Sequence, residues 1–190
     1  MPILDIAGFC GSLRAQSFNG AALRLAGQLM PPSLKMEEVA WRDLPPFDAD
    51  VLARGKPEPV TRVQERIRRA DGLLLVLAEY NSSIPGMFKN MIGWVSRGDD
   101  QPFAGKPVAI LSATTGPVGG ARMQYDLRRA MLFLDARTLQ KPEVFIGQAA
   151  GKFDADGNCT DEATRKFVGV QMAAFEKWIH ACHRMREPQA

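Results

Sequence analysis

The strongest constraint on the fold is an alternation of short apolar runs with amphipathic stretches along the chain. Uninterrupted short apolar runs are typical of strands buried on both faces, whereas apolar residues spaced three or four apart indicate helices. The sequence predicts strands at 3–8, 35–40, 73–77 and 108–112, and a broken fifth strand at 138–146. It predicts helices at 20–29, 57–70, 86–96, 121–134 and 161–183.

This order of elements predicts an α/β fold with a doubly wound five-stranded parallel sheet and helices on both faces, because each parallel crossover is right-handed and covers one face. A chain of 190 residues has room for one such unit, so we expect a single domain over 1–190. Ligands of such sheets bind beyond the carboxyl ends of the strands. Three loops of unusual composition leave strands at that edge, at 9–19, 78–85 and 113–120.

Charge and hydropathy argue against two classes of partner. The net charge is only +3, and the basic residues are spread along the chain, so we expect no nucleic-acid partner. The longest apolar stretch, 72–78, is far too short to span a membrane, and the first residues lack the pattern of a secretory leader. We therefore expect a cytoplasmic protein with no membrane partner.

The cysteines and histidines do not indicate a disulfide framework or a metal site. The three cysteines form no CxxC pair, and we interpret Cys10 as a small buried packing residue in preference to a redox-active thiol. His180 and His183 lie one helical turn apart, but no third ligand accompanies them. We expect no bound metal and interpret these histidines as positive charge near a helix C-terminus.

The first loop has the composition of a phosphate site. It lies between a strand and a helix, where free backbone N–H groups and the helix dipole favour an anion. Ser12, Ser17 and Asn19 offer polar side chains, and Arg14 offers charge-assisted hydrogen bonds. The loop matches neither GxxxxGK[ST] nor GxGxxG, which argues against nucleotide-triphosphate or dinucleotide binding in those modes. The alternative is an ordinary capped helix, with Ser17 as N-cap and Arg14 solvated.

Two motifs together resemble the signatures of the NADPH-dependent FMN reductases. One is Gly11-Ser12-Leu13-Arg14 with Ser17 and Asn19; the other is the segment 79–86, EYNSSIPG, with Lys89-Asn90 and Trp94. The segments 104–107, 119–122 and 124–128 resemble the chromate or quinone reductase branch of that family. The resemblance covers nearly the whole chain. It implies a flavodoxin-like fold that binds FMN non-covalently, uses NADPH or NADH, and assembles as a homodimer or homotetramer.

The resemblance also implies which residues bind the flavin. Those expected around the FMN phosphate are Ser12, Arg14, Ser17, Phe18 and Asn19. Those expected along the isoalloxazine are Glu79, Tyr80, Asn81 and Ser82, with Thr114 and Gly116 near its pyrimidine edge. The chain departs from the family pattern at Ala78, where proline is common, and at Pro117 after Gly116. Neither departure removes a proposed donor.

No catalytic side chain is expected, since flavin carries the electron transfer and neither histidine lies near the three loops. Tyr80 can supply an aromatic plane or be a half-buried loop residue, and Glu79 can contact flavin or orient the loop. The third loop can donate N–H groups to the flavin, while Gly119-Gly120 can serve ligand approach or helix packing. Arg122 is a candidate for attracting an NADPH phosphate or an oxyanion.

The leading hypothesis is an NAD(P)H-dependent FMN enzyme that reduces quinones, chromate or similar acceptors by two electrons. The alternatives are a flavodoxin-type electron carrier and a flavin-binding module without turnover. Carriers of that kind are typically acidic with a threonine-rich first loop, whereas this chain is slightly basic and carries Arg14. The physiological acceptor, the preferred nicotinamide nucleotide and the choice between dimer and tetramer stay open.

The expected helix at 86–95 carries more apolar residues than one buried stripe requires, namely Met87, Phe88, Met91, Ile92, Trp94 and Val95. We expect part of this surface to be buried in a symmetric dimer that completes the nicotinamide pocket. On that expectation a charge at Met91 yields a monomer without FMN retention or activity. The alternative is that the C-terminal helix of the same chain covers the surplus.

Overall fold

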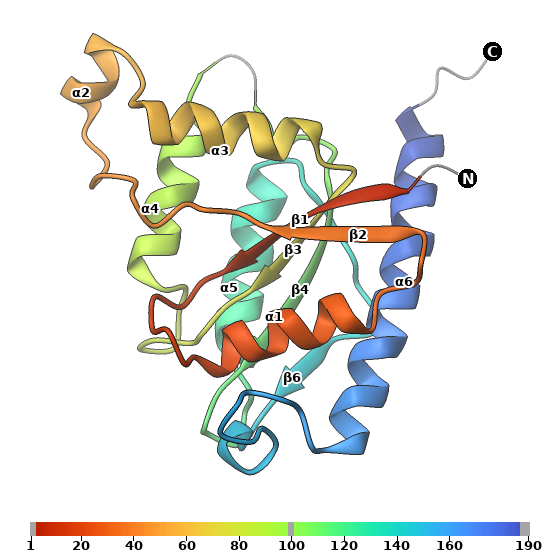
Figure 1. Ribbon diagram of the computed structural model, residues 1–190. Coiled ribbons are helices and arrows are strands. Elements are labelled where there is room, and N and C mark those ends of the chain that lie inside the picture. Colours follow the sequence, from red (N-terminus) through yellow and green to blue (C-terminus); the bar gives the residue numbers. More distant parts are fainter. Residues whose placement is uncertain (1–2, 99–100, 187–190) are drawn as a thin grey trace.

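A parallel sheet runs through the middle of the computed structural model, which describes residues 3–98 and 101–186 (Figure 1). Its strands are β1 (Leu4–Cys10), β2 (Leu34–Glu38), β3 (Gly72–Val76), β4 (Pro107–Ala113), β5 (Arg137–Thr138) and β6 (Val144–Ile146). The order is β2-β1-β3-β4-β5, and β6 also pairs with β4. All pairs are parallel. The predicted doubly wound, flavodoxin-like sheet is confirmed, and its fifth position is shared by β5 and β6.

Helices cover both faces of the sheet. They are α1 (Phe18–Gln28), α2 (Ala49–Arg54), α3 (Glu58–Arg69), α4 (Gly86–Val95), α5 (Ala121–Phe133) and α6 (Glu162–Arg186), with a short 3₁₀ turn at Ala149–Gly151. The five expected helices are present with bounds shifted by at most a few residues, and α2 is additional. Among the described residues, no helix combines the length and apolar character that crossing a membrane requires.

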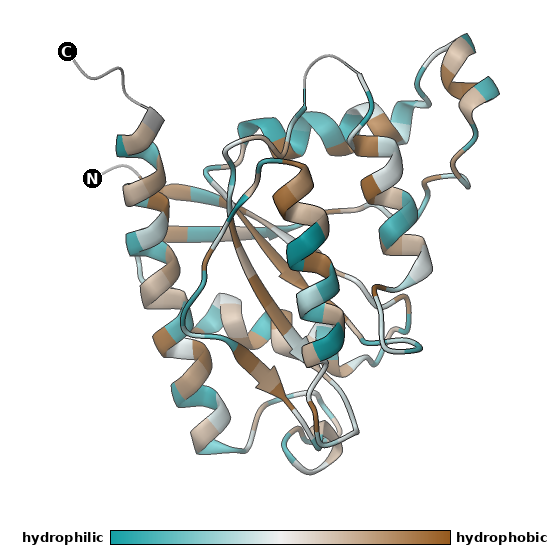
Figure 2. Cartoon of the chain, turned by 180° about the vertical axis from the view of Figure 1, so that it is seen from behind, coloured by the Kyte–Doolittle hydropathy of each residue, from teal (hydrophilic) through white to brown (hydrophobic). Residues whose placement is uncertain are grey.

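Two separate cores lie on the two faces, because successive side chains of a strand point to opposite sides. Leu73 and Leu75 of β3 belong to the core beneath α3, α4 and α5, whereas Leu74 and Val76 belong to the core beneath α1 and α6. Every residue of β3 and β4 is buried. In Figure 2 these strands are the continuous brown segments at the centre.

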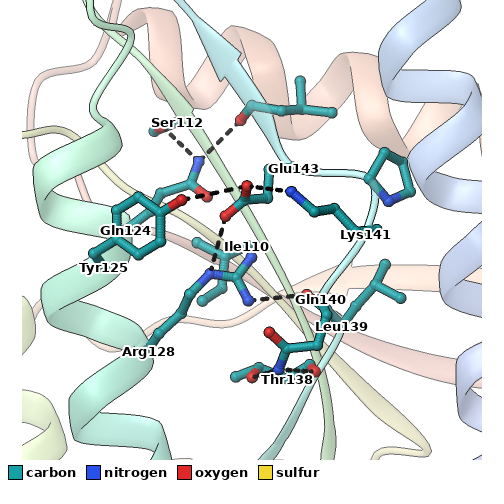
Figure 3. A network of polar contacts seen from close by, with 12 residues as sticks. Ile110, Ser112, Gln124, Tyr125, Arg128, Thr138, Leu139, Gln140, Lys141 and Glu143 are labelled. Atoms are coloured by element: carbon teal, nitrogen blue, oxygen red, sulfur yellow. Dashed lines mark hydrogen bonds and ion pairs between the residues drawn. The ribbon is translucent and has the colours of Figure 1, made fainter.

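The break in the fifth strand is bridged by side-chain amides from helices on both faces. Its Lys141-Pro142 peptide bond is cis. From α6, Gln171 donates to the carbonyl oxygens of Ile110 at 3.0 Å and Pro142 at 3.1 Å. From α5, Gln124 donates to the Val144 carbonyl at 2.9 Å (Figure 3). The amides tie both helices to the interrupted edge of the sheet.

Glu143, which directly precedes β6, is the centre of a polar cluster that includes Tyr125 and Arg128 of α5 (Figure 3). It accepts from Lys141 Nζ at 2.9 Å and from the Tyr125 hydroxyl at 3.4 Å, and it lies 3.8 Å from Arg128 Nε. Arg128 also donates to the Leu139 carbonyl at 3.0 Å. Burial by itself would raise the pKa of Glu143, but these hydrogen bonds and cationic neighbours lower it. The cluster holds α5 against the segment that leads into β6.

Five of the six apolar residues of α4 are buried within this chain and Met87 is half-buried, so the expectation that a partner must bury them is wrong. Phe88, Met91 and Trp94 are at most 1% exposed. The cover is α3 together with the segment between β2 and α2: Trp94 Nε1 donates to the Pro45 carbonyl at 2.8 Å, and Trp41 packs edge-on against Phe88. The alternative cover, α6, is also wrong, because that helix packs on the opposite core.

A charge at Met91 is therefore expected to destabilise the domain itself. Met91→Glu buries an unpaired carboxylate and should lower the free energy of unfolding by about 3 kcal/mol or more. The matched control is Val170→Glu on α6, where the side chain is 51% exposed and the change should stay within about 0.5 kcal/mol. Urea unfolding followed by circular dichroism measures both. A Met91→Glu protein as stable as the wild type would contradict the assigned core.

Candidate functional site

The three loops that leave β1, β3 and β4 enclose a cavity of about 340 Å³ at the carboxyl edge of the sheet. Its lining residues are Ser12, Arg14, Ser17, Phe18, Asn19, Ala78, Glu79, Tyr80, Ala113, Thr114 and Thr115. Larger open hollows lie beside Arg42 and along α5, but neither is formed by these three loops together. The cavity lies at the point where the strand order reverses, between β1 and β3, which is where such sheets bind ligands.

All first-loop residues predicted around the phosphate line this cavity, as do Glu79, Tyr80 and Thr114. Asn81, Ser82 and Gly116 do not line it. Sequence reasoning did not predict Ala78, Ala113 and Thr115, which also line the cavity. Their signal was position alone, since each directly adjoins a residue that was predicted.

The turn at 12–19 presents a run of free backbone donors. None of its N–H groups donates to another residue in the part of the chain that the structure describes. Ser17 is the N-cap of α1, and its hydroxyl oxygen accepts from the Gly20 N–H at 2.9 Å. The capped helix considered as an alternative is thus present, and it leaves the other donors of the turn available. Such a turn at a helix N-terminus favours an anion.

Four hydrogen bonds from other parts of the chain hold this turn and the end of β1 that leads into it. The Asn19 side chain, only 4% exposed, donates to the Ala113 carbonyl and accepts from the Ala113 N–H, each at 2.9 Å. Trp41 Nε1 donates to the Cys10 carbonyl at 3.2 Å, and an Arg42 guanidinium N–H donates to the Ser12 carbonyl at 3.3 Å. Because Asn19 bonds both polar groups of Ala113, the first and third loops are locked side by side.

Arg14 is an exposed cation at the edge of the cavity. The guanidinium of Arg14 is exposed, lies 5.6 Å from the centre of the Phe18 ring, and forms no ion pair within the described ranges 3–98 and 101–186. Its charge is therefore available to a ligand.

Cys10 is a free thiol, 2% exposed, whose sulfur contacts the Ser12 carbonyl. Its burial agrees with its interpretation as a packing residue.

The second loop is a tight turn with a strained backbone. Tyr80 and Ser83 exchange backbone hydrogen bonds of 3.2 and 3.0 Å, while the two central residues have positive φ, 50° at Asn81 and 63° at Ser82. This is the geometry of a type I′ turn, which glycine and asparagine adopt most readily. The turn leaves Tyr80 53% exposed beside the cavity and carries Asn81 and Ser82 away from it.

Glu79 fixes the second loop to the start of α5. Its carboxylate accepts from Arg122 Nε at 2.9 Å and from the Met123 N–H at 3.2 Å, and its side chain is only 9% exposed. A hydrogen bond from Ser83, helped by Arg129, lowers the pKa of Asp126 and adds a second link to the same helix. Of the two roles left open for Glu79, these contacts favour orienting the loop.

The third loop is held by the segment after β6. The Thr114 N–H donates to the Ile146 carbonyl at 2.9 Å, and the Thr114 and Gly116 carbonyls accept from Ala149 and Gln148. The Thr114 N–H is therefore unavailable to a ligand. In the described chain, the Thr115 and Gly116 N–H groups donate to no other residue.

Gly119 and Gly120 are required by packing. Both have left-handed backbones, with φ of 65° and 88°. A Cβ at Gly119 would come within 2.7 Å of the Phe145 backbone, and one at Gly120 within 2.8 Å of Ser112. Of the two roles considered for these glycines, helix packing is the one that the contacts support.

Comparisons with known proteins agree with this geometry. The family model described as NADPH-dependent FMN reductase matches residues 4–151. An NAD(P)H-dependent FMN reductase of Pseudomonas aeruginosa is 44% identical over 93% of this chain and 95% of its own length. A quinone reductase of Escherichia coli is 42% identical with the same coverage of both chains. The solved flavoenzyme NAD(P)H:(acceptor) oxidoreductase FerB of Paracoccus denitrificans has a TM-score of 0.86 and 35% identity, over 94% of this chain and 98% of that one. The chain therefore belongs to the NADPH-dependent FMN reductase family, which makes it an oxidoreductase that uses FMN and NAD(P)H.

Proposed function

We propose that the cavity holds FMN with its phosphate in the turn at 12–19. The observation that carries this proposal is the run of backbone N–H groups without a partner in the described chain, at the N-terminus of α1. A phosphate monoester carries about 1.5 to 2 negative charges at pH 7 and accepts several such bonds. Arg14 adds an exposed positive charge, and the hydroxyls of Ser12 and Ser17 line the same cavity. These residues fit the group.

The second and third loops are proposed to hold the isoalloxazine ring. Tyr80 offers an exposed aromatic face beside the cavity, and the N–H groups of Thr115 and Gly116 are free to donate to the pyrimidine edge. Asn81 and Ser82 would then shape the turn without lining the cavity. Glu79 would set the spacing between the two loops through Arg122 and Met123.

We propose that the enzyme reduces quinones by two electrons at the expense of NADPH or NADH. Bound FMN supplies the hydride transfer, and the protein holds the ring while leaving one side accessible. Several relatives that cover nearly the whole chain are named quinone reductases, which supports this acceptor class. Chromate is a further proposed acceptor, supported by the resemblance in sequence and by the slight positive net charge. Cytoplasmic location stays a prediction of the sequence.

The reductase is distinguished from a flavodoxin-type carrier by its reaction with nicotinamide nucleotide. Under anaerobic conditions, NADPH or NADH should bleach the visible absorption of the FMN-loaded protein, and added benzoquinone should restore it. Free FMN at the same concentration is the control. A protein that retains FMN but is bleached by neither nucleotide would be a carrier or a binding module.

Removing the exposed positive charge of Arg14 tests the proposed phosphate site. Arg14→Ala should weaken FMN binding by about 1.5–3 kcal/mol, the usual contribution of a hydrogen bond to a charged group. Arg54→Ala, on the remote helix α2, is the matched control and should leave binding unchanged. Fluorescence titration of the apoprotein measures both. An unchanged dissociation constant for Arg14→Ala would contradict the placement of the phosphate.

Self-association is proposed through α5 instead of α4. Leu132 and Phe133 are 79% and 89% exposed. Phe133 lines a groove between α4 and α5 together with Ile84 and Ile92, and Leu132 lines the neighbouring hollow along α5. Large exposed apolar patches commonly mark protein interfaces, and the family resemblance supports a second copy as the occupant. Whether the assembly is a homodimer or a homotetramer is part of the test.

Sedimentation velocity tests this surface. The wild type should sediment as an oligomer, and the double variant Leu132→Glu/Phe133→Glu should sediment as a smaller species with unchanged circular dichroism. Charges are tolerated there because both side chains are already solvent-exposed in the monomer. A monomeric wild type, or a variant with the wild-type sedimentation coefficient, would contradict the proposed surface.

A further inference from the structure

A small hairpin lies in the segment between β6 and α6, drawn in blue below α1 in Figure 1. Phe153 and Cys159 form its antiparallel bridge, and Gly157, with φ of 80°, turns its tip. The Asp154 carboxylate accepts from the backbone N–H groups of Asn158 at 2.7 Å and Asp156 at 3.0 Å. These hydrogen bonds lower the pKa of Asp154. The hairpin at 153–159 is thus organised by its own contacts.

This hairpin lies against the phosphate turn, and none of its residues lines the flavin cavity. Phe153 is only 6% exposed, and its ring centre lies 6.0 Å from that of Phe18. Phe18 in turn carries the guanidinium of Arg14 at 5.6 Å. Ser17 and Phe18 line both the flavin cavity and a separate cavity of about 100 Å³ that residues 153–157 of the hairpin also line. The phosphate turn is therefore in contact with the hairpin as well as with the cavity.

The hairpin supports the turn at Phe18, whereas Ser12 and Asn19 are held by other parts of the chain. Backbone N–H groups bind an anion well only if they are held in place beforehand, because ordering a mobile turn consumes binding free energy. The Asn19–Ala113 bonds hold the helical end of the turn. Near Phe18, the aromatic contact with Phe153 is the support that the hairpin supplies.

We infer that Phe153 is a positioning residue for the FMN phosphate and that the hairpin at 153–159 sets the preference of this chain for FMN over riboflavin. The inference rests on the proposed phosphate site. Loss of the Phe153 ring lets Phe18 and the turn move, which weakens contacts to the phosphate. Contacts to the isoalloxazine belong to the second and third loops, so binding of riboflavin, which lacks the phosphate, is spared.

The experiment compares two ligands on three proteins. Apoprotein of the wild type, Phe153→Leu and Phe175→Leu is titrated with FMN and with riboflavin by flavin fluorescence. Phe175→Leu is the matched control, since it makes the same change at a fully buried ring that packs against Gly72, at the opposite end of the sheet. Phe153→Met replaces Phe153→Leu if the latter does not fold.

The expected result is a dissociation constant for FMN raised about tenfold by Phe153→Leu, with that for riboflavin changed less than about twofold. Phe175→Leu should leave the ratio of the two constants at the wild-type value. An equal loss for both ligands would make Phe153 merely structural and overturn the inference, as would an unchanged FMN constant. A wild type without preference for FMN would instead refute the phosphate site, and the inference with it.

Discussion

The reversal of strand order at β1 is the constraint on which the site depends. The chain runs from β1 to β2 on one side and then crosses to β3 on the other, so the loops after β1 and β3 separate at the carboxyl edge. The space between them cannot be filled by a crossover helix. The strands that lead to this edge are anchored in the two cores. Every residue of β3 and β4 is buried, which fixes the points where their loops begin.

Within that crevice, the proposed phosphate site depends on the N–H groups of the turn at 12–19 that have no partner in the described chain. The first N–H groups of a helix have no acceptor within the helix, so they remain available to an anion. Contacts that fix the turn come from distant parts of the chain: Asn19 to Ala113, Trp41 to Cys10, and Phe18 to Phe153. The shape of the proposed phosphate site thus depends on the packing of several loops.

Much of this could be predicted from sequence because it depends on local pattern. The spacing of apolar residues predicted the strands and five of the helices. The polar residues before α1 predicted the first loop of the cavity. Helix α2 was missed because it is six residues long and buries none of them. The cover of Met91 was also missed, since an irregular segment with Trp41 supplies it and leaves no periodic signal. The partners of Glu79 lie more than forty residues away, beyond the reach of motif spacing.

An amide NMR titration of the isotopically labelled apoprotein tests most directly whether the turn at 12–19 binds the FMN phosphate. With FMN, the N–H resonances of residues 12–19 should move downfield as they donate to the phosphate, and inorganic phosphate should move the same resonances in the same direction. Riboflavin should move resonances of the second and third loops while leaving those of the turn in place. Resonances at 12–19 that respond equally to FMN and riboflavin, or to neither, would contradict the central claim.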